Sequence, residues 1–157
     1  MKTITICSSA NFYRQAVDIQ AKLENSGFKV FIPVTAEKMK ATGDFDASHY
    51  RTWFADANDY HKKTALMREH FDKVEKGDAV LILNFEKRGV QNYIGGNVLM
   101  EMALAFHLRK PIFILNEIPD ESAYLEEIIG MHPVVLHGKI EDLIKKYKKL
   151  SAVKTVD

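Results

Sequence analysis

The chain has 157 residues, of which 46% are hydrophobic and 27% charged, as expected for one folded domain with a substantial core. Its net charge of +1 gives no general attraction to nucleic acid or to anionic membranes, and no apolar run approaches the ~20 residues that span a bilayer. The single cysteine, Cys7, excludes an internal disulfide framework. The first residues run directly into a strand pattern without the features of a signal peptide, so we expect a soluble, cytoplasmic protein.

Strand and helix patterns alternate along the chain. The predicted strands are short apolar runs bounded by turn residues, and they cover residues 3–7, 28–32, 78–84, 111–115 and 133–136. The predicted helices cover residues 12–23, 55–76, 96–109, 122–129 and 140–150. Residues 34–52 have no clear period, so we expect an irregular loop with room for a helical turn.

This alternation predicts a specific fold. Strands that are separated by helices form a parallel sheet through right-handed crossovers, with helices on both faces. We therefore expect residues 1–157 to form a single domain, an α/β three-layer sandwich whose five-stranded parallel sheet has the flavodoxin-like order 2-1-3-4-5. In such a sheet the ligand crevice lies where the first strand adjoins the third.

The segment from Asn92 to Glu101 carries the strongest functional signal. It follows the buried strand at residues 78–84, and its Gly95-Gly96 pair opens a helix. The first N–H groups of a helix are free to bind an anionic or polyhydroxylated ligand. The glycine pair alone is weak support, because a tight strand-to-helix turn favours glycine for its backbone angles.

The loops after the first and third strands should meet in the predicted topology. The residues expected to bind substrate there are polar or glycine, namely Ser8, Ser9, Asn11, Asn84, Asn92, Tyr93, Gly95, Gly96 and Asn97. Glu101 lies beside an apolar stripe of its helix, one turn after Asn97, where a carboxylate could be half-buried and poised for reaction. The alternative is a solvated Glu101 that only complements the helix dipole.

The order of motifs resembles a known family. The run from Asp78 to Ile82, the pair Gly95-Gly96, Glu101 with its alanine neighbours and the Lys110-Pro111 turn are similar to the nucleoside 2-deoxyribosyltransferase superfamily, which includes deoxynucleoside monophosphate N-glycosidases. The resemblance implies that Glu101 attacks the anomeric carbon and forms a glycosyl-enzyme ester. It also implies an aromatic hydroxyl that orients the nucleophile, for which Tyr13 is the nearest equivalent and Tyr93 a rival.

The chain departs from the family pattern at three places. Ala103 replaces the usual glycine two residues after the glutamate, and His70 stands where the family carries an aspartate. His70 could protonate a departing base, or it could be an ordinary half-buried histidine. No acidic residue stands just before Gly95, so transfer between bases has less support than hydrolysis or binding.

We therefore expect an enzyme that cleaves or transfers the N-glycosidic bond of a nucleoside or nucleotide, with Glu101, Tyr13 and His70 as its catalytic residues. A non-catalytic nucleotide-binding module of the same fold and a phosphoribohydrolase of the lysine-decarboxylase-like type remain open as alternatives. We expect no cofactor and no metal, because the six histidines lack ligand spacing. Nucleic acids and membranes are not expected partners, and relatives of this architecture suggest a homodimer or larger oligomer.

Overall fold

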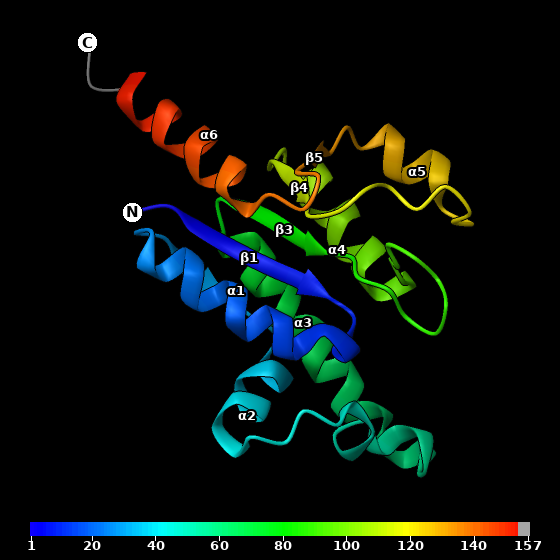
Figure 1. Ribbon diagram of the computed structural model, residues 1–157. Coiled ribbons are helices and arrows are strands. Elements are labelled where there is room, and N and C mark those ends of the chain that lie inside the picture. The colour runs from blue at the N-terminus through cyan, green and yellow to red at the C-terminus, as the bar shows by residue number, and fades with distance from the viewer. Residues whose placement is uncertain (154–157) are drawn as a thin grey trace.

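The computed structural model describes the backbone of residues 1–153 and the side chains of residues 1–147. One parallel sheet with the order β2-β1-β3-β4-β5 runs through the molecule (Figure 1). Its strands are β1 (Thr3–Ser8), β2 (Lys29–Phe31), β3 (Ala79–Leu83), β4 (Ile112–Ile114) and β5 (Val134–Val135). The predicted α/β sandwich and its strand order are confirmed.

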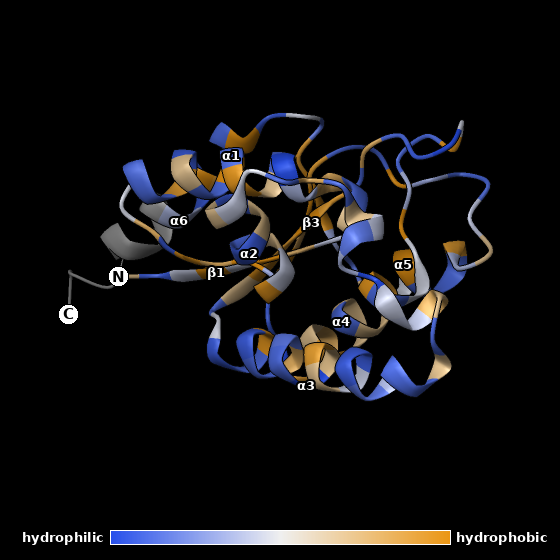
Figure 2. Ribbon diagram, turned by 90° about the horizontal axis from the view of Figure 1, so that it is seen from below, coloured by the Kyte–Doolittle hydropathy of each residue, from blue (hydrophilic) through white to orange (hydrophobic). Residues whose placement is uncertain are grey.

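Helices cover both faces of this sheet. They are α1 (Tyr13–Asn25), α2 (Val34–Thr42), α3 (Tyr60–Lys76), α4 (Gly96–His107), α5 (Leu125–Gly130) and α6 (Ile140–Val153). One core lies between the sheet and α1 with α6, and the other lies between the sheet and α3, α4 and α5. Figure 2 shows α1 and α3 on opposite sides of the strands.

The alternation of side chains along β1 assigns its residues to the two cores. Ile4 and Ile6 point into the core beneath α1, whereas Cys7 belongs to the core beneath α3 and α4. All of these side chains are fully buried, and every residue of β3 is buried as well. Strands that are covered on both faces should be continuously apolar, as the sequence pattern indicated.

The end of α3 is docked tightly onto β1. The hydroxyl of Thr5 donates a hydrogen bond of 2.7 Å to the carbonyl oxygen of Lys73. At Gly77, directly after the helix, a Cβ atom would lie 2.4 Å from Thr5 Oγ1, so no larger residue fits without a shift. Lys110, which precedes β4, donates to the carbonyl oxygens of Val74, Glu75 and Gly77 and so satisfies the open end of α3.

Two expectations from the sequence need correction. Residues 34–42 form the regular helix α2, which ends at Gly43 with a left-handed φ of 75°, where a loop had been expected. The helix expected to begin at residue 55 begins at Tyr60, after short 3-10 turns at residues 47–49, 52–54 and 57–59. Between Pro33 and Gly43 only two positions of α2 are buried, too few to give a helical period in the sequence.

Candidate active site

A cavity of about 240 Å³ opens at the carboxyl ends of β1 and β3. It lies between the loop after β1, the first turns of α4, the middle of α3 and the segment of 3-10 turns. Its lining residues include Ser8, Ser9, Tyr13, Tyr50, Arg51, Trp53, Lys63, Met67, His70, Lys87, Tyr93, Gly95, Gly96, Asn97, Val98 and Glu101. This position is the expected crevice beside the first and third strands.

Three polar side chains from three different elements meet at the floor of the cavity, and two of them, His70 and Glu101, line it. Cys7 comes from β1, His70 from α3 and Glu101 from α4, and all three residues are buried. His70 Nε2 lies 3.8 Å from Glu101 Oε2. One ligand atom from each residue lies within 4.8 Å of the other two, so the sheet and both helices converge at this point.

The turn before α4 explains how Glu101 reaches the floor. Gly95 caps the helix in an extended conformation, and a Cβ atom there would lie 2.8 Å from the hydroxyl of Tyr93. The glycine therefore lets the tyrosine ring pack directly against the turn. From this start, Val98 and Met102 face the core, and Glu101 lies on the same buried side of α4.

Burial sets the charge of these groups. It raises the pKa of Glu101 to about 8, although the nearby Cys7 thiol and the Lys63 ammonium favour the carboxylate. Burial, together with the charge of Lys73, lowers the pKa of His70 to about 4. The polar backbone of Ile6 raises this pKa in part. The pKa of the Cys7 thiol is raised by burial and then by Glu101. At neutral pH the side chains of Cys7, His70 and Glu101 are therefore mostly uncharged.

Tyr13 stands at the first turn of α1 and lines the same cavity. Its pKa is raised by burial and by the neighbouring Glu101 carboxylate, and lowered in part by Arg51. A phenol near a carboxylate is a hydrogen-bond donor that can orient it. This is the role that the family resemblance gives to Tyr13.

Three cations surround the upper part of the cavity. Lys87 Nζ donates a hydrogen bond of 3.0 Å to Ser9 Oγ and lies 4.6 Å from the centre of the Tyr93 ring, which links the loops after β1 and β3. Burial lowers the pKa of both Lys63 and Lys87, and the charge of Arg51 lowers both further. Among the side chains of residues 1–147, none of these three cations forms an ion pair with a carboxylate. An anionic ligand would therefore meet unpaired positive charge.

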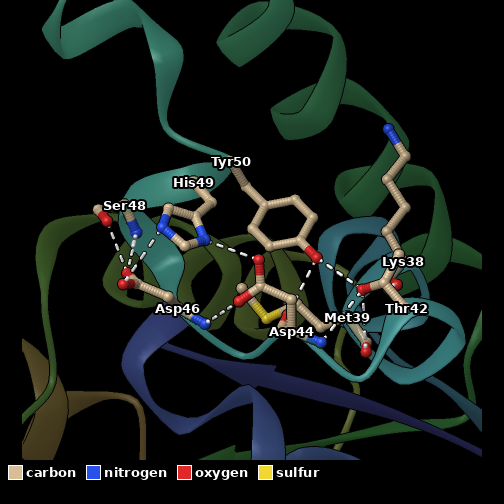
Figure 3. Close-up of polar contacts among 8 residues, drawn as sticks. All are labelled: Lys38, Met39, Thr42, Asp44, Asp46, Ser48, His49 and Tyr50. Carbon is tan, nitrogen blue, oxygen red and sulfur yellow. Dashed lines mark hydrogen bonds and ion pairs between the residues drawn. The ribbon is translucent and has the colours of Figure 1, made fainter.

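Residues 42–50, which we call the roof, border the cavity through Ala47 and Tyr50. Figure 3 shows the hydrogen bonds that make this segment compact. His49 Nδ1 lies 2.6 Å from Asp44 Oδ2, and Asp46 accepts a hydrogen bond of 2.9 Å from the backbone N–H of Ser48. The hydroxyl of Tyr50 donates to the carbonyl oxygen of Asp44 at 2.9 Å. These bonds hold the backbone that presents Tyr50, Arg51 and Trp53 to the cavity.

The structure brings most of the expected site residues together. Nine of them line this cavity, namely Ser8, Ser9, Tyr13, His70, Tyr93, Gly95, Gly96, Asn97 and Glu101. Asn11 is exposed and Asn92 lies beside a second, wider cavity of about 920 Å³ near residues 117–124. Neither residue lines the first cavity.

Asn84 has a different place from the one expected. Its side chain is fully buried, accepts a hydrogen bond of 2.9 Å from the backbone N–H of Asn116 and donates one of 2.8 Å to the carbonyl oxygen of Glu117. Asn116 Nδ2 in turn donates to the carbonyl oxygen of Asn84 at 3.1 Å. These three bonds join the ends of β3 and β4, so the structure gives Asn84 a structural position outside the cavity lining.

Sequence reasoning missed three residues of the site. Cys7 lies on the face of β1 opposite to that of Ile6, and this face brings it close to His70 and Glu101. Lys63 lies on the side of α3 that also carries Met67 and His70, seven residues before the histidine. Lys87 follows β3 in a loop that has no periodic signal.

No protein-family model matches this sequence, and a search of curated proteins gives no match. Within the part of the chain that the structure describes, no helix is both long enough and apolar enough to cross a bilayer.

Proposed function

We propose that the protein breaks the N-glycosidic bond of a nucleoside 5′-monophosphate, with Glu101 as the nucleophile. The observation that carries the proposal is the position of Glu101, a buried carboxyl group on the floor of a cavity that the loops after β1 and β3 enclose. Its neighbours Tyr13 and His70 come from α1 and α3. The resemblance to the nucleoside 2-deoxyribosyltransferase superfamily supports the same role.

The proposed reaction has two steps. A carboxylate oxygen of Glu101 bonds to the anomeric carbon while the bond from that carbon to the base nitrogen breaks, and the base takes a proton from water in the open mouth of the cavity. The hydroxide that remains from that water, or a second water that gives it a proton, then attacks the same carbon, Glu101 leaves as a carboxylate, and the sugar phosphate is released. The developing positive charge on the sugar favours the ionised form of Glu101.

The three cations support a phosphorylated substrate. Lys63, Lys87 and Arg51 line the cavity together with the hydroxyl groups of Ser8 and Ser9. Charge-assisted hydrogen bonds from such groups are the usual way to hold a phosphate. The substitution Lys87→Met should therefore raise KM for a 5′-monophosphate far more than for the unphosphorylated nucleoside, whereas Lys139→Met, at an exposed position away from the cavity, should leave both unchanged.

The position of His70 supports a role as a positioning residue. Its side chain is buried beneath the cavity, and Nε2 lies on the side of Glu101. The base must depart from the face of the sugar opposite the nucleophile, so a group beside Glu101 is badly placed to protonate it. We assign to His70 the task of fixing the orientation of the carboxyl group.

Mass spectrometry of the protein after brief exposure to a panel of nucleoside monophosphates tests the proposal. We expect release of free base, followed chromatographically, and a sugar-phosphate adduct on the peptide that contains Glu101. Glu101→Gln should abolish both signals, and Glu24→Gln, an exposed acid on α1, should retain them. Base release that persists in Glu101→Gln would contradict the assignment.

A nucleotide-binding module is the second candidate, because the three unpaired cations can hold a phosphate whether or not Glu101 reacts. Titration calorimetry separates the two functions. Saturable binding of a nucleotide without product after long incubation would establish the binding module and exclude the enzyme for that ligand.

A further inference from the structure

The polar cluster beneath the cavity has more hydrogen-bonding capacity than the surrounding structure uses. Within the described part of the chain, neither ring nitrogen of His70 has a hydrogen-bond partner of good geometry, and the same is true of Glu101 Oε2. Both residues are almost completely buried. Buried polar atoms without partners are rare and costly, so this cluster calls for a further ligand.

We propose that Cys7, His70 and Glu101 bind one zinc ion. The sulfur, imidazole nitrogen and carboxylate oxygen are the three ligand types that Zn²⁺ takes from proteins. Three protein ligands leave the fourth tetrahedral position open, and because His70 and Glu101 line the cavity, water from the cavity can fill it.

The distances between the three ligand atoms are only slightly longer than those in a tetrahedral zinc site. Zinc bonds of about 2.0–2.3 Å at tetrahedral angles bring the ligand atoms to roughly 3.3–3.8 Å from one another. The pair formed by His70 Nε2 and Glu101 Oε2 already lies at 3.8 Å, and all three ligand atoms lie within 4.8 Å of one another. The other two pairs of ligand atoms would have to shorten by at most about 1.5 Å.

Charge balance also favours a zinc ion in this buried place. On binding, the Cys7 thiol and any protonated Glu101 release their protons to solvent, and His70 binds as the neutral imidazole. The thiolate and the carboxylate together neutralise Zn²⁺, so the filled site has no net charge. Lys63 and Lys73, whose charges act on Glu101 and His70, would oppose a cation that was not neutralised in this way.

This inference goes beyond the proposed function and can be tested without any substrate. A Glu101 carboxylate that holds zinc is not free to attack a sugar, so zinc should inhibit base release. Metal binding itself is measured directly, however, and its presence or absence does not depend on whether the protein is a glycosidase.

Cobalt substitution gives the sharpest test, because Cys7 is the only cysteine of the chain. Addition of Co²⁺ to the intact, metal-free protein should produce a thiolate-to-cobalt charge-transfer band and the intense visible spectrum of a tetrahedral site. The band should saturate at one equivalent and disappear when one equivalent of Zn²⁺ is added. A cobalt spectrum without the thiolate band, or no binding at all, would overturn the proposal.

Substitutions identify the other ligands. Cys7→Ser and His70→Ala should each weaken zinc binding by about tenfold or more in a competition with a chromophoric chelator. His107→Ala is the matched control, because it removes an exposed histidine at the end of α4, away from the cavity, and should leave the affinity unchanged. Circular dichroism confirms that each variant is folded. Unchanged affinity in folded His70→Ala, or a loss in His107→Ala, would contradict the assigned ligands.

Discussion

Two histidine–carboxyl pairs border the cavity, and their pKa values are shifted in opposite directions. Beneath it, His70 Nε2 lies 3.8 Å from Glu101 Oε2, and burial lowers the pKa of the histidine to about 4 and raises that of the acid to about 8. In the roof, His49 lies 2.6 Å from Asp44 in an exposed position, where their hydrogen bond raises the pKa of the histidine and lowers that of the acid. The imidazole and carboxyl groups are thus mostly neutral where they are buried, and they form an ion pair where they are exposed to solvent.

The largest difference between the two pairs should appear in catalysis. His70→Gln should lower kcat for base release by about 10²-fold with little change in KM, because a misplaced Glu101 still allows the substrate to bind. His49→Gln should leave kcat close to that of the unchanged protein, and any effect should appear in KM, because His49 supports the segment that carries Arg51 to the cavity. Steady-state kinetics with a nucleoside monophosphate measures the effect, and a rise in KM without a loss of kcat would assign His70 to substrate binding.

The contact between α3, which carries His70 of the buried pair, and β1 should contribute to the stability of the protein. Gly77→Ala places a methyl group against Thr5 and should lower the free energy of unfolding by about 1–3 kcal/mol. Gly130→Ala is the matched control, because nothing lies within 4 Å of a Cβ atom there and its φ is not positive. Urea denaturation of both variants measures the difference. Equal stability would show that the contact between α3 and β1 is readily relaxed.

Removal of a carboxyl group should have opposite effects in the two pairs. Glu101→Met should raise the free energy of unfolding by about 1 kcal/mol or leave it unchanged, because it removes a buried polar atom that has no partner. Asp44→Asn should lower it, because it weakens an existing ion pair. Thermal denaturation of the metal-free proteins compares the variants, and marked destabilisation by Glu101→Met would show that the carboxyl group supports the fold.

The smallest expected effect is on the stability of the roof, to which the pair of His49 and Asp44 should contribute in a pH-dependent way. The raised pKa of His49 means that its contribution is complete below the usual value of 6.5 and is lost as the pH rises through the raised pKa. The lowered pKa of Asp44 means that its contribution is present above the usual value of 3.8 and is lost as the pH falls through the lowered one. The pair should therefore be strongest between these two values.

NMR titration of the His49 ring measures this pKa directly. Asp44→Asn should lower it toward 6.5, and added salt should reduce the shift because the pair is exposed. A pKa of His49 that is the same in Asp44→Asn would mean that Asp46 alone supports the charge.

The sheet was predictable from the sequence because strands buried on both faces leave continuous apolar runs. Residues 79–83 and 112–114 are such runs, and the parallel order follows from the helices between them. Helix α2 escaped prediction because its burial is confined to Ala36 and Met39. The convergence of Ser8, Tyr13, Gly95 and Glu101 on one cavity followed from topology alone.

Positions that depend on tertiary contacts could not be predicted. Asn84 directly follows β3, as a ligand-binding asparagine would, and only the proximity of Asn116 and Glu117 shows where its hydrogen bonds go. The same holds for Cys7, whose partners come from residues more than 60 positions away. A sequence reveals which residues can react, whereas their neighbours decide which of them share a site.

The hydrogen bonds of Asn84 have a consequence for how ligands enter. They tie β3 to the segment after β4, so the sheet cannot spread on that side to admit a bulky molecule. The roof, by contrast, rests on short-range bonds within residues 42–50, most of them exposed. Substitutions in residues 43–59 should therefore change the size of the ligand that the cavity accepts, while the strands keep their positions.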